Sequence, residues 1–285
     1  MRFIGCALAW RPGEAAEKQS CLVVLDERGS IISNSFAGSA EELARTAEGY
    51  TSDRRGVVVG ADAPLAIPNE RGTRIVHRVL AKAALPAHSA SRNQFDGTIQ
   101  SEDFLQELEE VGIQYTDYPF PRDRGQWVVT EVDSSATLKV LSLERGNGNG
   151  SSDLSESLRA MPEPKLRKGN KEARAAAIKG AVDILWNTPG LRLRTGNLSA
   201  DLSLSENVDL SKTEVSATLS HADFDKLVSL IEATLAAYTV HRHWKGRDGS
   251  MVVGTGDTGS VLLPASDALH ERIAEECRTA KVPYV

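Results

Sequence analysis

The sequence predicts an α/β fold in which a mixed β-sheet is flanked by helices. Short apolar or alternating segments predict strands, and longer segments with apolar residues three or four apart predict helices. The order of these two kinds of segment along the chain predicts which strands pair with their neighbours and which are joined by a crossover helix.

Three strands are expected at the start of the chain, over residues 2–10, 21–26 and 30–36. The turn sequence Asp26-Glu27-Arg28-Gly29 separates the second from the third, so these two are expected to form a hairpin.

A helix and a buried strand are expected next. Ser39 and Glu42 form a capping-box pattern, which predicts a helix to about Tyr50. Residues 56–61 (GVVVGA) are apolar throughout and predict a strand buried on both faces, central in the sheet and parallel to the first strand. Three strands, a helix and a buried strand are the opening order of the RNase H fold. The expected core is therefore an RNase H-like mixed five-stranded sheet.

The rest of the chain predicts further helices, one more core strand and a C-terminal hairpin. Helices are expected over residues 73–84, 101–111, 171–186, 222–241 and 267–280, and strands over 126–131, 250–253 and 260–263. No internal repeat is present. We expect a single domain over residues 1–285, with helical insertions at about 66–122 and 144–215.

Composition limits the classes of function. The net charge of −6 and the pI near 5.6 argue against a protein that coats nucleic acid non-specifically, although a local basic patch is compatible with them. No apolar stretch approaches the roughly 20 residues of a membrane-spanning helix. Cys6, Cys21 and Cys277 are odd in number and lack CxxC spacing, so free thiols and a cytoplasmic location are expected.

Four acidic residues stand where a site is expected. Asp62 follows the strand at 56–61 and Glu131 ends the strand at 126–131, while Asp223 and Asp225 begin the helix at 222–241. Active sites gather at the carboxyl ends of strands, and converging carboxylates can hold Mg²⁺ for phosphodiester hydrolysis. Each acid also has a structural interpretation, as a turn residue, a helix cap or a partner of the helix dipole.

Basic residues gather before the helix at 171–186. The cluster consists of Lys165, Arg167, Lys168, Lys171 and Arg174, with Arg192 and Arg194 as an extension. It is expected either to form a solvated helix face or to contact phosphate beside the acidic site.

Five short motifs occur in the order IGCALAW, GADAPLAIPNERGTR, VVTEVDSSATLKVL, HADFDKLVSLIEATLAAYTVHRHWKGR and VVGTGDTGSVLLP. In these motifs the chain resembles an uncharacterised family of predicted RNase H-like, Holliday-resolvase-type nucleases. The resemblance implies a nuclease that uses Mg²⁺ or Mn²⁺ and acts on nucleic acid. It implies that Asp62, Glu131 and Asp225 are the metal ligands and catalytic acids, and that Arg74 is a binding residue.

The chain departs from this pattern at Ala7, where the family has an aspartate in the first strand. A methyl group binds no metal, and Cys6 faces the other side of the strand. Glu14 or Glu17 could replace the missing acid. The alternative is a non-catalytic binding or regulatory protein on the same scaffold. An ATP-using relative is a third hypothesis, disfavoured because residues 10–14 make a poor phosphate loop.

Three other patterns are less specific. Residues 254–259 spell GxGxxG, but a strand follows them, so a hairpin turn is expected instead of a dinucleotide site. His241 and His243 are expected in a solvated turn at a helix end, with metal ligation as the alternative. His88 is expected to be a turn residue, with a role in the site as the alternative.

Overall fold

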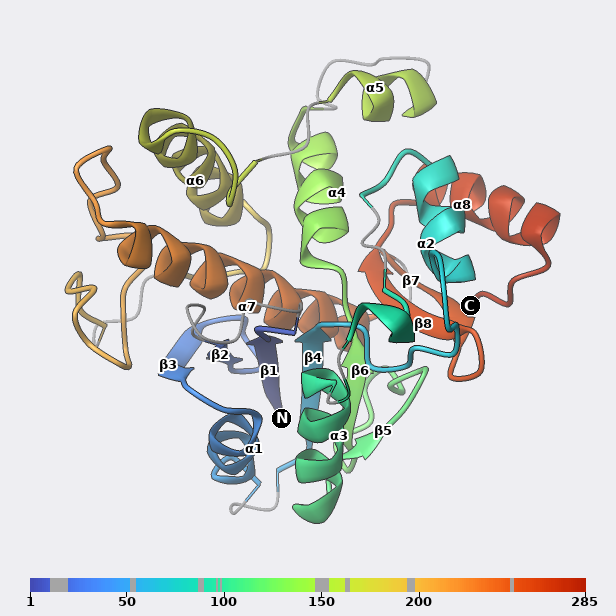
Figure 1. Cartoon of the computed structure of the whole chain (residues 1–285), viewed down its shortest axis with the longest axis horizontal. Coiled ribbons are helices and arrows are strands. Elements are labelled where there is room, and N and C mark those ends of the chain that lie inside the picture. Colours follow the sequence, from blue (N-terminus) through green and yellow to red (C-terminus); the bar gives the residue numbers. More distant parts are fainter. Residues whose placement is uncertain are drawn as a thin grey trace.

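A computed structural model shows a six-stranded mixed sheet with helices on both faces and a separate two-stranded hairpin (Figure 1). The structure describes residues 1–10, 20–51, 55–86, 90–95, 97, 99–146, 154–161, 165–193, 198–246 and 249–285. The strand order in the large sheet is β3-β2-β1-β4-β6-β5. Its strands are β1 (Arg2–Ala7), β2 (Ser20–Leu25), β3 (Ile31–Ala37), β4 (Val57–Asp62), β5 (Gln114–Tyr115) and β6 (Trp127–Glu131).

The strand pairing confirms the predicted start of the fold. The first three strands are antiparallel neighbours, and β1 is parallel to β4, which is in turn parallel to β6. The turn between β2 and β3 is held by Asp26, whose Oδ1 accepts the N–H groups of Arg28 and Ser30 at 2.9 Å each. Strand β4 is buried and central, as its apolar sequence predicted. The two-residue edge strand β5 was not predicted, because two residues carry no periodicity.

The described residues form the helices α1 (Ala40–Glu48), α2 (Ile75–Lys82), α3 (Gln100–Glu110), α4 (Ser134–Gly146), α5 (Leu154–Ala160), α6 (Lys171–Trp186), α7 (His221–Lys245) and α8 (Asp267–Ala280), with a 3₁₀ turn η1 at Arg92–Gln94. Helix α1 begins where its capping pattern predicted, with the Glu42 N–H donating to Ser39 Oγ at 3.1 Å. Helix α4 was not predicted. It follows β6 directly and is capped by Asp133, whose Oδ1 accepts the N–H of Ala136 at 2.8 Å.

Helices α1 and α3 pack on one face of the sheet and α7 crosses the other (Figure 1). Two glycines bring the α7 backbone close to the sheet. A Cβ on Gly5 of β1 would lie 1.9 Å from the carbonyl oxygen of Ala233, and one on Gly60 of β4 would lie 2.8 Å from that of Ala236. The position of α7 over β1 and β4 is therefore fixed by backbone contact.

The C-terminal hairpin consists of β7 (Ser250–Thr255) and β8 (Gly259–Pro264), which packs with α2, α4 and α8 in a separate apolar cluster. The GxGxxG pattern at residues 254–259 spans its turn and the adjoining strand ends, as predicted. Cys6, Cys21 and Cys277 are free and buried, as expected. Among the helices of the described ranges, none combines the length and apolar character needed to span a bilayer.

Candidate functional site

Two of the predicted acids lie at the carboxyl ends of neighbouring strands. Asp62 ends β4 and Glu131 ends β6, and both line a small cavity of about 20 Å³. The other residues around this strand-end pocket are Trp10, Ala63, Pro64, Arg74, His77, Val132 and Asp133. A cavity of this size has room for about one water molecule.

Glu131 is committed to a buried ion pair with Arg74. Both oxygens of the carboxylate accept from the guanidinium, with Nη1 at 2.9 Å from Oε2 and Nη2 bonded to Oε1. The N–H of Leu65 also donates to Oε2 at 2.9 Å. The two side chains are 0% and 3% exposed for Arg74 and Glu131. Burial raises the pKa of Glu131, and the guanidinium and the Leu65 N–H oppose that rise.

Arg74 organises this side of the pocket. Its Nη1 donates to the Ala66 carbonyl oxygen at 2.8 Å, and its Nη2 lies 3.2 Å from His77 Nε2. A guanidinium can only donate, so His77 Nε2 is the acceptor in that contact. A Cβ on Gly259 would lie 2.9 Å from Arg74 Nη1, so glycine is needed at the start of β8. Arg74 therefore has a structural role and is too buried to serve as an exposed phosphate contact.

Asp62, at the end of β4, bonds to the first residue of α4. Its Oδ1 accepts the N–H of Ser134 at 2.9 Å, and its Oδ2 accepts the Ser134 hydroxyl at 2.6 Å. Burial, followed by the negative charges of Glu232 and Asp133, raises the pKa of Asp62 to about 6, against the effect of the bonds from Ser134. A carboxyl group whose pKa is raised by burial and by neighbouring acids is typical of functional sites.

The side chains of Asp62 and Glu131 leave the sheet on opposite faces. Glu131 pairs in register with Ala61, and Asp62 pairs with Ala7. Since paired residues share a face, Glu131 lies on the face covered by α1 and α3, whereas Asp62 and Ala7 lie on the face covered by α7. The two carboxylates approach the pocket from different sides.

Asp223 and Asp225 have structural partners at the start of α7. Asp223 forms a capping box with Ser220, accepting its N–H at 3.1 Å while the Ser220 hydroxyl caps the helix. Asp225 Oδ1 accepts from Arg174 Nη2 of α6 at 2.7 Å. Neither residue lines the strand-end pocket. The structure therefore does not bring Asp225 together with Asp62 and Glu131.

Glu232 is the helix acid that the sequence interpretation missed. It lies on α7 seven residues after Asp225, which is about two turns and ~10 Å further along the same helix face. Its charge is among those that raise the pKa of Asp62. Its two oxygens accept from Arg167, at 3.2 Å from Nε and 2.5 Å from Nη2. An acid inside the apolar run Leu230-Ile231-Glu232-Ala233 was the available signal.

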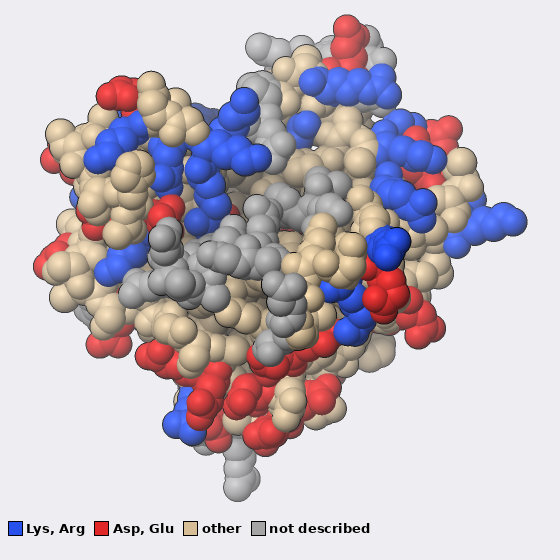
Figure 2. Space-filling view, in the orientation of Figure 1, with Lys and Arg blue, Asp and Glu red and all other residues tan. Residues whose placement is uncertain are grey.

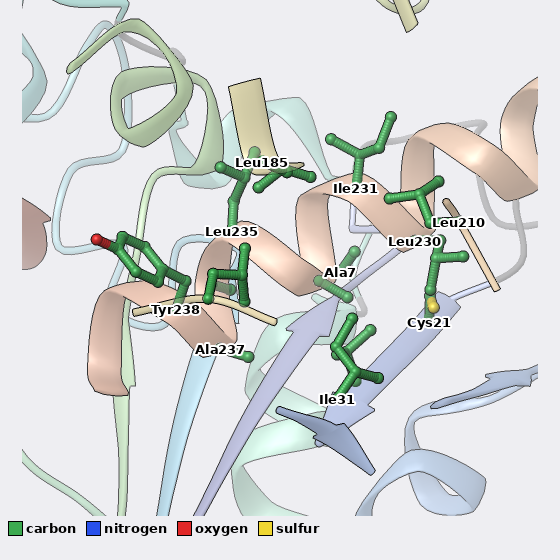
Figure 3. Packing of buried hydrophobic residues seen from close by; sticks show 14 of the residues in the cluster. Ala7, Cys21, Ile31, Leu185, Leu210, Leu230, Ile231, Leu235, Ala237 and Tyr238 are labelled. Atoms are coloured by element: carbon green, nitrogen blue, oxygen red, sulfur yellow. The ribbon is translucent and has the colours of Figure 1, made fainter. Parts of the chain in front are cut away.

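Ala7 occupies the position where a first-strand acid was expected. It is 1% exposed and faces α7, with Cys21 on the neighbouring strand (Figure 3). In register, it pairs with Cys21 on one side and with Asp62 on the other. Burial raises the pKa of Cys21, and the nearby Cys6 and Glu232 add to the rise, so the thiol stays protonated. The floor of the site between Asp62 and β2 is thus a methyl group and a neutral thiol.

Some residues of the basic cluster are exposed, and others are held by hydrogen bonds or ion pairs within the protein. Lys165 and Lys168 are exposed, whereas the Lys171 ammonium donates to the Leu219 carbonyl oxygen at 2.7 Å. Arg174 is buried against Phe224 in its pair with Asp225.

The histidines of the HxH pattern are not in a solvated turn, because α7 continues to Lys245 and buries both. His243 Nδ1 lies 2.8 Å from Ser250 Oγ and its Nε2 lies 2.7 Å from the Pro119 carbonyl oxygen, so this ring joins three segments. Glu14, Glu17, His88 and Arg194 lie outside the described residues.

The residues present do not fit a two-metal centre. In the part of the chain that the structure describes, no three His, Cys, Asp or Glu side chains form a group that could hold a metal ion. Glu131 is bound by Arg74 on the other face, and the position facing Asp62 carries only the methyl group of Ala7. Comparison with protein-family models, curated proteins and solved structures gave no match.

Proposed function

We propose that this protein binds the phosphate backbone of nucleic acid on an RNase H-like scaffold and does not cleave it by a two-metal mechanism. The strand order, with three antiparallel strands followed by parallel β4 and β6, is compatible with that scaffold. The observation that carries the proposal is the register pair of Ala7 with Asp62, because it leaves the centre of the carboxyl edge without a ligand.

The distribution of charge supports a polyanionic partner. Lys and Arg gather around α6 and α2, whereas Asp and Glu gather over α1 and α3 (Figure 2). The chain is negative overall but polarised, and such a field orients an anionic ligand toward the basic side. Exposed Lys165 and Lys168 flank Arg167, which reaches Glu232 beside Asp62. The basic segment Lys165–Lys168 therefore borders the carboxyl ends of the strands, where Asp62 lies.

The test is binding and cleavage of labelled oligonucleotides. We expect single- or double-stranded oligonucleotides to bind with an affinity that falls with salt. Each charge reversal, Lys165→Glu or Lys168→Glu, should reduce the slope of log affinity against log salt by about 1, since one phosphate contact is lost. Arg45→Glu, an equal change of charge on exposed α1, should leave the slope unchanged. Lack of binding by the wild type, or equal loss in the control, refutes the proposal.

Hydrolysis with a single cation is a second candidate, favoured by one observation. Asp62 and Glu232 lie on the same side of the sheet, and their repulsion helps to raise the pKa of Asp62. A divalent cation between two carboxylates would relieve this repulsion. Cleavage that depends on Mn²⁺ and disappears in both Asp62→Asn and Glu232→Gln would establish this candidate in place of the non-catalytic one.

A further inference from the structure

A cavity lined by arginines lies at the opposite edge of the sheet from the strand-end pocket. It has a volume of about 450 Å³ and is formed at the amino ends of β1 and β4, by the β2–β3 turn and by the segment before β6. Its lining consists of Met1, Arg2, Asp26, Glu27, Arg28, Arg55, Gly56 and Arg124. The lining thus contains four arginines and two acidic residues, and the amino group of Met1 adds a fifth positive charge.

Both carboxylates already have partners. Asp26 Oδ1 accepts two backbone N–H groups of its own turn. Glu27 accepts from the Met1 amino group at 2.8 Å and from Arg124 at 3.2 Å. The pKa of Glu27 is lowered, chiefly by the bond from the Met1 amino group, with Arg124 and Lys245 contributing. The two acids therefore stabilise the walls of the cavity, and the positive charges of its lining still outnumber the negative ones.

Arg2 and Arg28 supply that excess. Within the described residues, no carboxylate lies within ion-pair distance of either guanidinium, and both belong to elements with fixed backbones, β1 and the β2–β3 turn. A guanidinium carries five N–H donors in a planar fork that matches two oxygens of a phosphate group. Several such forks around one concave volume favour an anion with more than one phosphate group.

We propose that this arginine pocket binds a compact polyphosphate anion, such as the di- or triphosphate group of a small molecule. The four arginines come from four separate segments around one cavity of about 450 Å³, which suits a compact anion. The pocket shares no lining residue with the strand-end pocket or the Lys165–Lys168 segment, so this inference is independent of the proposed function.

The experiment is calorimetric titration with sodium tripolyphosphate as the probe. We expect saturable one-to-one binding by the wild type, weakened at least about tenfold in Arg2→Gln/Arg28→Gln, since each lost charged hydrogen bond counts for about a factor of ten. The matched control Arg78→Gln/Lys82→Gln removes two charges from α2 and should bind like the wild type. If the double variant does not fold, Arg55→Gln in the exposed loop takes its place.

Three results would overturn the proposal. They are no saturable binding to the wild type, equal binding to the double variant, and displacement of tripolyphosphate by an oligonucleotide whose own affinity falls in Arg2→Gln/Arg28→Gln. The last result would assign the pocket to a nucleic-acid surface. A protein that binds tripolyphosphate here but no oligonucleotide anywhere would contradict only the proposed function.

Discussion

Replacing Asp62 by asparagine should make the protein more stable at neutral pH. Asparagine keeps an oxygen for the Ser134 N–H, and its amide can donate to the Ser134 hydroxyl oxygen, so both bonds of the aspartate can be replaced. The substitution removes the negative charge that Glu232 and Asp133 oppose. Removal of a charge that is repelled by two neighbouring acids is therefore expected to stabilise the fold.

The size of the effect follows from the raised pKa. A carboxyl with a pKa of about 6 in the folded protein and about 3.9 in the unfolded chain lowers stability by up to ~3 kcal/mol above pH 6. Asp62 is only partly buried, and contact with solvent weakens the repulsion, so we expect about 1–3 kcal/mol. Below pH 4 Asp62 is protonated in both the folded and the unfolded state, so it does not lower the free energy of unfolding. Between pH 4 and 6 only the folded state keeps the proton, so this contribution to stability declines as pH rises.

The assay is urea unfolding of wild type and Asp62→Asn from pH 4 to pH 8. The difference in unfolding free energy should be near zero at pH 4 and should grow through pH 6 to its full value. Asp223→Asn is the matched control, since Asp223 also bonds a serine N–H and hydroxyl, but these bonds lie at the exposed start of α7. This control should not become more stable than wild type, because it removes a bond that caps α7. An Asp62→Asn variant no more stable than wild type at pH 7.5 would show that the like-charge argument is wrong.

Three further predictions concern the sheet and its edge. Ala7→Asp should lower the melting temperature in calorimetry without metal, and Mg²⁺ should restore it; no response to Mg²⁺ would show that residue 7 does not face the acids. Arg74→Met should cost about 3–5 kcal/mol in urea unfolding, because it leaves Glu131 buried without its partner, and pairing it with Glu131→Leu should recover most of the loss. Gly5→Ala should cost about 3 kcal/mol or more by forcing α7 off the sheet, whereas Gly180→Ala, with open space around it, should be neutral or stabilising; similar melting temperatures would contradict the close packing.

The sheet was predictable because its strands have a clear local pattern. The run at Val57–Asp62 is apolar throughout and has no helical spacing, and the β2–β3 turn carries its own bonding residue, Asp26. Helix α4 was not predictable in this way. It begins with Ser134 and Ser135 and contains Thr137, which are weak helix formers, and its start is set by the cap of Asp133.

The site was predictable only to the level of the sheet edge. The sequence placed Asp62 and Glu131 at strand ends, but their faces depend on a register that pairs Glu131 with Ala61 and Asp62 with Ala7. A shift of one residue reverses the face, and no local pattern reports it. Glu232 could have been predicted from the sequence, because it lies seven residues after Asp225 and so on the same helix face.

The close seating of α7 on the sheet has a consequence for synthesis of the chain. Strands β1 and β4 are complete once residue 62 has been made, but the helix that covers their second face begins only at His221. At about 5–20 residues per second, the intervening stretch of roughly 160 residues takes on the order of 10–30 s to translate. During that interval Phe3 and Val58, which are fully buried in the finished protein, have no helix over them. Newly made chains thus pass through a long-lived stage with an uncovered apolar sheet. In that stage the sheet can bind a chaperone or another nascent chain.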